Sequence, residues 1–290
     1  MVQDANAARL AFLPDNADSL KRFRKMEMVA WKRSLHLELP EGGIHADARE
    51  AGFSSAYRRS ELRIGRASAQ DEIRATLFTA EAAGPRKFVI LAHPRGVAAY
   101  LDDAKQPSGL AKALLARNIS VLLFDAFMTG PLADAGLMAA RNPFTNFFTT
   151  YNRTVLQERV QDLVTLCAFA RGADKGPKVF ISGEGPAGLW ALLAAPMADG
   201  VVADADGFDG LATERWLRPD TFTPAILAIG GIDAVASLAA PNPLTIHGAP
   251  ATFAADWLHH SYQAASSADH LKIKPAKLAP EEIVTALEKY

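Results

Sequence analysis

A glycine-rich turn between an apolar strand and an apolar helix is the part of this sequence best suited to chemistry. Residues 183–188 read GEGPAG and follow the apolar run KVFIS. Strand, sharp turn and helix in this order present a serine nucleophile when the turn is written G-x-S-x-G. The nucleophile position falls on Gly185, which has no side chain. Ser182 and Glu184 are the nearest substitutes, and each needs a shift of register to reach the apex.

A second element of the same chemistry is missing from the turn. One donor to the oxyanion is the backbone N–H of the residue after the nucleophile. That residue is Pro186, which has no N–H. The glycines also match the dinucleotide pattern G-x-G-x-x-G, with Asp204 and Asp206 near the place of its acidic residue. That pattern belongs to the first β-α unit of a sheet, and Glu184 would repel a pyrophosphate, so we predict no cofactor.

Composition limits the classes of protein to consider. The 290 residues suffice for one large α/β domain with an appendage, and 49% of them are hydrophobic. Lysine and arginine number 31 against 32 acidic residues, which argues against a nucleic-acid partner. No apolar run has the length of a membrane span, and no His, Cys, Asp and Glu set has metal-ligand spacing. The N-terminus shows no signal-peptide pattern, which leaves the compartment open.

Residues 1–50 differ from the rest and are predicted to form a helical extension. Residues 17–40 are basic and amphipathic, with Asn16 or Asp18 as the candidate N-cap and Pro40 as the end. We favour packing of this helix on the main domain over contact with a partner chain.

Residues 57–290 are predicted to form an α/β domain. Alternating apolar and polar residues predict an antiparallel hairpin at 60–66 and 72–79. Apolar runs predict buried strands at 86–93, 118–126, 178–182, 200–207, 243–248 and 270–273. Helices are predicted at 103–117, 154–171, from Pro186 onward and at 280–289. This alternation indicates a mostly parallel sheet with helices on both faces.

The ordered elements resemble the α/β-hydrolase fold, and within it the acetyl xylan esterase and dienelactone hydrolase group. The resemblance rests on VILAHPRG, SVLLFDA, the helix and strand that lead into VFISGEGPAGLWALLAA, and the late run ending in APNPLTIHG. Together these stretches cover most of residues 57–290. The resemblance implies an esterase-type domain whose nucleophile elbow is degenerate.

The resemblance also implies where a catalytic base and acid would stand. The base would lie in the loop after the last strand, but the residues after HLKI contain no histidine. The remaining candidates for the base are His247, His259, His260 and His270. Asp256 is the nearest candidate acid after TIHG, and Asp204, Asp206 and Asp209 are the alternatives.

The connection between Asp125 and Thr154 is long and aromatic. A long connection at the carboxyl edge of a parallel sheet is typical of a lid or binding loop. We predict that its rings fill the vacant cleft or form a subunit interface, ahead of binding a substrate. The candidate binding residues are His93, Arg95, Phe127, Phe147 and Tyr151.

The sequence therefore predicts an acetyl-xylan-esterase-like protein that lacks the serine nucleophile and the catalytic histidine. It would serve as a non-catalytic binding or assembly module, beside an active hydrolase domain or as a homo-oligomer. A small ester or a carbohydrate is the candidate ligand. The alternative is a working carboxylic ester hydrolase that uses Ser182 or Glu184 with one of the histidines and Asp256.

Overall fold

A single mixed sheet organises the computed structural model, which describes residues 12–40, 42–54, 57–80, 87–145, 147–172 and 176–289. Its strands are β1 (Ile44–Phe53), β2 (Tyr57–Arg66), β3 (Ile73–Ala80), β4 (Lys87–Ala92), β5 (Ser120–Phe124), β6 (Lys178–Gly183), β7 (Gly200–Asp204), β8 (Leu244–His247) and β9 (Leu271–Ile273). Their order in the sheet is β1-β2-β3-β5-β4-β6-β7-β8-β9. Strands β1, β2 and β3 pair antiparallel, as do β3 and β5, and the pairs from β5 to β9 are parallel. The predicted fold class is confirmed.

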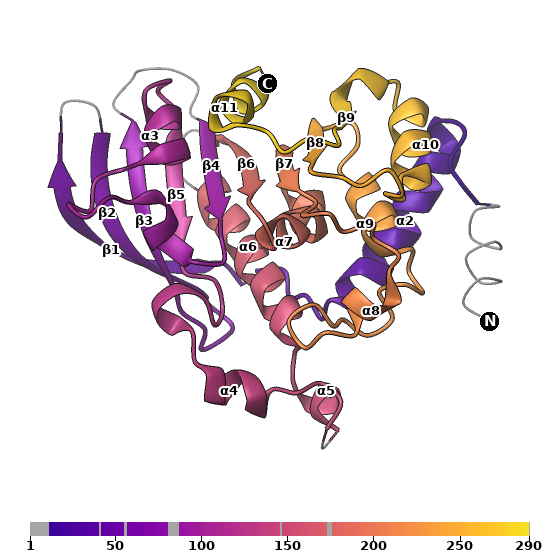
Figure 1. Ribbon diagram of the computed structural model, residues 1–290, viewed down its shortest axis with the longest axis horizontal. Coiled ribbons are helices and arrows are strands. Elements are labelled where there is room, and N and C mark those ends of the chain that lie inside the picture. Colours follow the sequence, from indigo (N-terminus) through magenta and orange to yellow (C-terminus); the bar gives the residue numbers. More distant parts are fainter. Residues whose placement is uncertain are drawn as a thin grey trace.

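Helices cover both faces of the sheet (Figure 1). Helices α3 (Gly109–Leu115) and α11 (Pro280–Glu288) pack together on one face. Helices α6 (Val155–Arg171), α7 (Ala187–Ala194) and α9 (Gly231–Ser237) cover the other. The remaining helices and 3-10 turns are α2 (Ala17–Ser34), α4 (Ala135–Ala140), α5 (Phe148–Tyr151), α8 (Thr213–Trp216), α10 (Asp256–Ala264), η1 (Gly96–Tyr100), η2 (Gly130–Leu132), η3 (Ala195–Met197) and η4 (Ala268–His270).

The N-terminal region departs from its prediction. Helix α2 ends at Ser34, and Ile44–Phe53 forms strand β1, which extends the sheet beyond β2. The sequence of β1, IHADAREAGF, is rich in residues that are rare in strands, so local propensity did not reveal it. Pairing with the otherwise unpaired edge of β2 supplies the hydrogen bonds that its own sequence does not favour. The predicted helix at 103–117 is shorter for a local reason, because Lys105 adopts φ +58° within a turn.

Helix α2 packs on the main core, as predicted. The Asn16 side chain caps its first turn, and Leu20 and Phe23 are buried against the core. The Trp31 side chain is 0% exposed, and its Nε1 donates a 2.8 Å hydrogen bond to the carbonyl oxygen of Leu193 in α7. Within the described ranges, no helix combines the length and apolar character that crossing a membrane requires.

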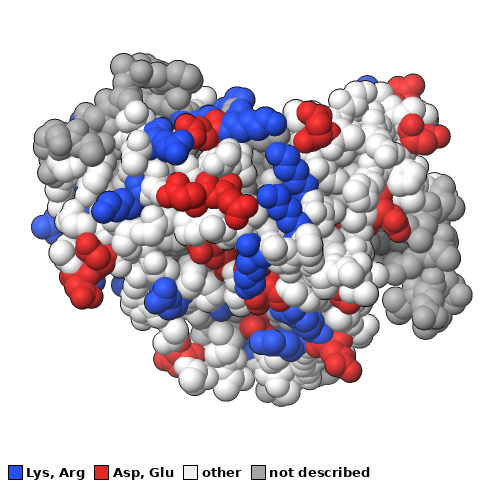
Figure 2. All heavy atoms as spheres, turned by 45° about the horizontal axis from the view of Figure 1, so that its top comes forward, with Lys and Arg blue, Asp and Glu red and all other residues white. Residues whose placement is uncertain are grey.

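The surface mixes charges of both signs. Figure 2 shows basic and acidic side chains interleaved on one face, with no large field of one sign. This distribution agrees with the formal net charge of −1.

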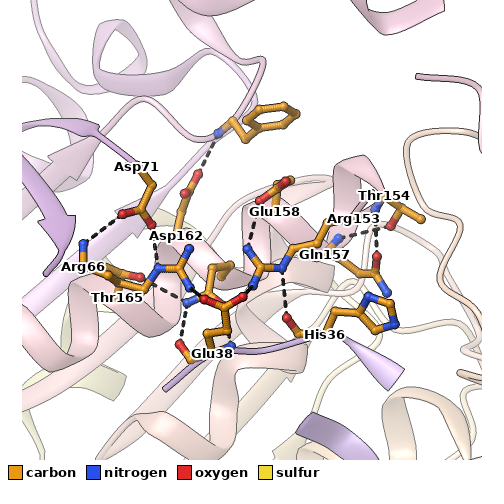
Figure 3. A network of polar contacts seen from close by, with 12 residues as sticks. His36, Glu38, Arg66, Asp71, Arg153, Thr154, Gln157, Glu158, Asp162 and Thr165 are labelled. Atoms are coloured by element: carbon orange, nitrogen blue, oxygen red, sulfur yellow. Dashed lines mark hydrogen bonds and ion pairs between the residues drawn. The ribbon is translucent and has the colours of Figure 1, made fainter. Parts of the chain in front are cut away.

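A polar network fastens the segment after α2 to the start of α6 (Figure 3). Arg66 Nη1 and Arg153 Nη2 lie 2.5 and 2.7 Å from the two carboxylate oxygens of Glu38. The side chain of Gln161 accepts from the Glu38 amide and donates to its carbonyl oxygen, at 2.9 and 3.0 Å. The network thereby holds the N-terminal segment, β2 and α6 together next to the long connection.

Trp31→Ala tests whether α2 is part of the core. The substitution removes a fully buried ring and its hydrogen bond, so we expect the free energy of unfolding to fall by about 3–5 kcal/mol. Val29→Ala, whose side chain is 50% exposed on the same helix, is the control and should cost far less. Urea unfolding of both variants measures the difference, and equal losses would contradict the packing of α2.

Candidate functional site

The turn after β6 keeps the backbone shape of a nucleophile elbow. Gly185 has φ +54°, and no described atom outside its chain neighbours lies within 4 Å of the position that a Cβ would take there. Gly188 is required for packing, because a Cβ would lie 1.8 Å from the carbonyl oxygen of Asp204. A Cβ on Gly183 would lie 2.5 Å from the Ala187 oxygen. The turn therefore retains its tight approach to β7 and has room at its apex, where it carries no side chain.

A row of polar residues follows the ends of neighbouring parallel strands. Asp204 pairs with His247 across β7 and β8. The last pairs of the other strands place Glu184, His93 and Asp125 at the same level. Side chains at one level of a parallel sheet point to the same face. The sheet thus gathers these five residues at its carboxyl edge, although they are far apart in the sequence.

Asp204 is the centre of the contacts at the elbow. Its Oδ2 accepts from the amide of Gly185 at 3.2 Å and lies 2.9 Å from Lys277 Nζ. Its Oδ1 accepts from the Asp206 amide at 2.8 Å. Burial alone would raise the pKa of Asp204, but Lys277 and the Asp206 amide outweigh it and lower that pKa. The carboxylate is therefore ionised at neutral pH and satisfied by groups of the protein.

Lys277 stands in the loop after β9, where the resemblance places the catalytic base. Its ammonium contacts Asp204 and lies 3.1 Å from Asp206 Oδ1. Hydrogen bonds to these two carboxylates raise the pKa of Lys277. An ammonium with a raised pKa keeps its proton at neutral pH, so Lys277 cannot accept one from a nucleophile.

The backbone donors of an oxyanion hole are also missing or occupied. Pro186 follows the apex and has no N–H. In the loop after β4, the Arg95 amide donates to His93 Nδ1 at 3.0 Å. The Gly96 amide donates to the carbonyl oxygen of His93 at 2.9 Å, and the Val97 amide donates to Asp125 at 3.0 Å. Two of these amides bond within the loop, and the third bonds to Asp125 at the end of β5.

The two predicted substitutes for the nucleophile differ in burial, because Ser182 is buried and Glu184 is half-buried. Ser182 is 1% exposed within β6, and its Oγ has no hydrogen-bond partner among the described residues. Glu184 lies two residues further on, and its Oε1 atom is likewise buried without a partner in the described part of the chain. The Glu184 carboxylate lies close to Tyr100, where burial and then this charge raise the pKa of the phenol well above its ordinary value. The structure places neither side chain at the apex.

His247 is the candidate base that the fold brings into the polar row. Its Nδ1 accepts from the amide of Leu278 at 3.3 Å, which puts the proton of the neutral ring on Nε2. Nε2 is buried without a partner among the described residues. Burial lowers the pKa of both His247 and His93, so each ring is neutral at neutral pH.

His270 and Asp256 lie outside this row. The Nδ1 of His270 is 2.7 Å from the carbonyl oxygen of Pro241, which precedes β8 at the amino edge of the parallel strands. Asp256 is exposed at the start of α10, a helix that packs on α9 and α2. Asp256 is held at the N-terminus of α10, and His270 directly before the edge strand β9. Neither residue is brought to the elbow.

The cavity over the elbow is small. Its volume is about 70 Å³, and Gly185, Asp206, Arg215 and Arg218 are among the residues around it. Ligand pockets usually hold several hundred cubic ångströms. The Arg215 guanidinium lies 4.6 Å from the ring centre of Phe208 and donates to the Asp206 carbonyl oxygen, which narrows the space.

The aromatic connection begins with an anchored segment. The Phe127 amide donates to Asp162 Oδ2 at 2.8 Å, and its carbonyl oxygen accepts from Arg159 Nε at 3.0 Å. The Arg159 guanidinium also lies 4.7 Å from the ring centre of Trp190. The Phe127 ring is half-buried beneath Arg141, whose guanidinium carbon is 4.8 Å from the ring centre.

The rest of the connection leaves the body of the protein instead of filling the cleft. Figure 1 shows α4 and α5 below the sheet, apart from the helices that cover it. Phe147 and Tyr151 are 83% and 84% exposed, and Phe144 is 53% exposed. The candidate binding residues therefore fall into two groups, with His93 and exposed Arg95 near the elbow and Phe147 and Tyr151 on the projecting arm of residues 135–151.

The sheet order, the elbow after β6 and the helices on both faces define the α/β-hydrolase fold. No family model and no curated protein matches the chain. A Bacteroides fragilis protein, provisionally assigned as an acetyl xylan esterase, has a TM-score of 0.68 at 10% identity, over 97% of this chain and 87% of its own. Acetyl xylan esterase 1 from Thermoanaerobacterium sp. has a TM-score of 0.55 at 13% identity, over 96% of both chains. A glucuronoyl esterase from Solibacter usitatus has a TM-score of 0.63 at 11% identity, over 94% of this chain and 93% of its own.

These identities support a shared fold and no more, because one fold hosts many activities. The predicted resemblance to esterases is confirmed at that level.

Asp162 makes a pH dependence of stability testable. Part of the residue is exposed, but protein atoms surround its carboxyl group densely. This burial raises the pKa of Asp162 to about 8, against about 3.9 in an unfolded chain. A carboxyl group with a raised pKa favours folding most at low pH, and this contribution is lost as pH rises toward 8. We expect Asp162→Asn to stabilise the protein relative to wild type by roughly 1–3 kcal/mol more at pH 8 than at pH 5.

Chemical denaturation at both pH values measures that difference, with Asp256→Asn as the exposed control. An Asp162→Asn variant whose stability follows wild type across this range would contradict the raised pKa.

Proposed function

We propose that this protein is an esterase-fold module that binds a ligand or a partner without cleaving an ester. The observation that carries the proposal is the contact of the Asp204 carboxylate with both Lys277 and the Gly185 amide. A serine hydrolase needs at this place a nucleophile, a neutral base and free oxyanion donors. Here the Asp204–Lys277 ion pair lies beside the turn. Gly185 offers no nucleophile, Lys277 is not a neutral base, and Pro186 has no N–H to donate to an oxyanion.

Two observations support a binding or assembly role. The names of the similar structures, acetyl xylan esterases and a glucuronoyl esterase, favour a carbohydrate or a small ester as the ligand. The projecting arm carries Phe147 and Tyr151 almost fully exposed, and exposed aromatic side chains are enriched where proteins meet partners. We propose that the arm contacts a second copy of the chain or an active hydrolase domain through these exposed rings.

Hydrolysis of p-nitrophenyl acetate, with a fluorophosphonate probe and intact-mass readout on the same sample, tests the loss of catalysis. We expect no turnover above buffer and no adduct, because the apex has no hydroxyl group. A probe adduct with turnover would overturn the proposal, and mapping the adduct would identify the nucleophile.

Gly185→Ser sharpens this test. The apex has room for the side chain, but Pro186 offers no donor and Lys277 no base, so we expect turnover to stay at the level of the matched variant Gly185→Ala. The alanine variant carries the same strain of a side chain at φ +54°, so it controls for folding. Activity in Gly185→Ser alone, about a hundredfold or more above Gly185→Ala, would mean that a base and an oxyanion hole are intact.

The alternative function is an ester hydrolase that uses Glu184. The observation in its favour is that Glu184 Oε1 and His247 Nε2, on strands separated only by β7, are both buried without partners in the described part of the chain. Under this alternative, wild type turns over p-nitrophenyl acetate without a probe adduct, and Glu184→Gln abolishes the activity. Glu281→Gln, on the exposed side of α11, is the control.

A further inference from the structure

An open groove of about 800 Å³ lies on strands β1–β3, away from the elbow cavity. Side chains on β2 alternate between the two faces of the sheet. Leu62 and Ile64 enter the core, whereas Glu61 and Arg63 face the groove together with Arg59. The 3-10 turn η1 and Lys105 bound its other side. The groove is ten times larger than the space above Gly185 and is within the range of ligand sites.

Two arginines stand directly opposite one another in this groove. Arg63 on β2 pairs with Arg74 on β3 in the antiparallel register, so both guanidinium groups leave the same face. Their side chains are 65% and 59% exposed. Like charges directly across a pair of strands destabilise a sheet. Their shared acidic contact is Glu72, at 3.3 and 3.8 Å, which lies outside the groove lining and leaves most of their donors facing solvent.

The next cross-strand row on the same face contains one basic, one acidic and one hydroxyl side chain. Arg49, Glu61 and Thr76 are register partners across β1, β2 and β3. The Glu61 carboxylate is held by Arg59 Nε at 3.1 Å and by the Thr76 hydroxyl at 3.2 Å. A fixed acceptor therefore lies one row away from the exposed arginine pair. Asp47, opposite Arg63, adds a second acceptor on β1.

We propose that this groove binds an acidic saccharide, with a sugar carboxylate between Arg63 and Arg74. Guanidinium groups match carboxylates through paired, charge-assisted hydrogen bonds. Sugar hydroxyls donate and accept, so they can use Asp47 at the β1 end of the arginine row and Glu61 and Thr76 in the next row. A polyphosphate or a run of acidic side chains would meet repulsion from Glu61 and Asp47, whereas widely spaced carboxylates on a polyhydroxylated chain would not.

Binding in the groove does not depend on the proposed loss of catalysis, because the groove and the elbow are made of different residues. The residues of the groove come from β1–β3 and the turn near Lys105, and Gly185, Pro186 and Lys277 are not among them. Asp125 lines the end of the groove and also belongs to the polar row at the carboxyl edge. Strands β5 and β4 lie between β3 and the elbow after β6, so a saccharide held in the groove does not depend on the elbow. Ester turnover and groove binding are measured separately, so either result can fail without the other.

Calorimetric titration of the full chain with tri-galacturonic acid is the test. Its neutral counterpart is the galactose trimer of the same linkage, in which each carboxylate is replaced by a hydroxymethyl group. Tri-glutamate supplies the same number of side-chain carboxylates without sugar rings. We expect binding of tri-galacturonic acid that weakens as salt rises, and at least about tenfold weaker binding of the other two probes.

The variant Arg63→Gln/Arg74→Gln should lose about tenfold or more in affinity for tri-galacturonic acid, since charge-assisted hydrogen bonds are removed. Arg117→Gln/Arg171→Gln removes two exposed arginines outside the groove and should bind as wild type does. Thermal unfolding checks that both variants are folded.

Each other outcome counts against the inference. Equal binding of the neutral trimer would show that the arginine pair does not recognise a carboxylate. Equal binding of tri-glutamate would show that the groove does not select a saccharide. No binding to wild type, or unchanged binding in folded Arg63→Gln/Arg74→Gln, would overturn the site.

Discussion

The Asp204 carboxylate is the group around which the carboxyl edge of the sheet is built. It accepts from the elbow amide of Gly185 and from Asp206, and it pairs with Lys277. Space for it depends on glycines on both sides. A Cβ on Gly188 would strike its backbone, and a Cβ on Gly248 would lie 2.5 Å from its Oδ1. A buried carboxylate is costly unless its lone pairs are satisfied, so these contacts explain why the turn stays tight.

The two polar surfaces use charge in opposite ways. At the elbow, Lys277 lies within 3.1 Å of two carboxylates, so its charge is already compensated by the protein. In the groove, Arg63 and Arg74 face each other on adjacent strands, share the carboxylate of Glu72 at 3.3 and 3.8 Å, and remain mostly exposed. Compensated charges hold a backbone in place, whereas exposed like charges favour an anion from outside.

The long connection and the N-terminal segment are fastened to the same helix. Asp162 and Arg159 on α6 hold the backbone of Phe127, and Gln161 on α6 holds the backbone of Glu38. Helix α6 thus fixes where the projecting arm leaves the core. Further along the arm, the Phe144 ring packs edge-on against Phe222 with ring centres 4.7 Å apart, whereas Phe147 and Tyr151 are presented to solvent. An arm that is held at its base and exposed at its tip suits contact with another molecule.

The sequence alone determined the fold class, the empty apex at Gly185 and the missing donor at Pro186. These follow from local pattern and from residue type, since apolar runs predict buried strands and proline has no N–H under any fold. Only the tertiary structure showed that β1 joins the sheet, that Lys277 reaches Asp204 and that Arg63 faces Arg74. Those contacts depend on strand order and register, which bring together residues as far apart in the chain as Asp204 and Lys277. Periodicity reports which face of an element is apolar, and only the packed sheet decides which side chains meet at its edge.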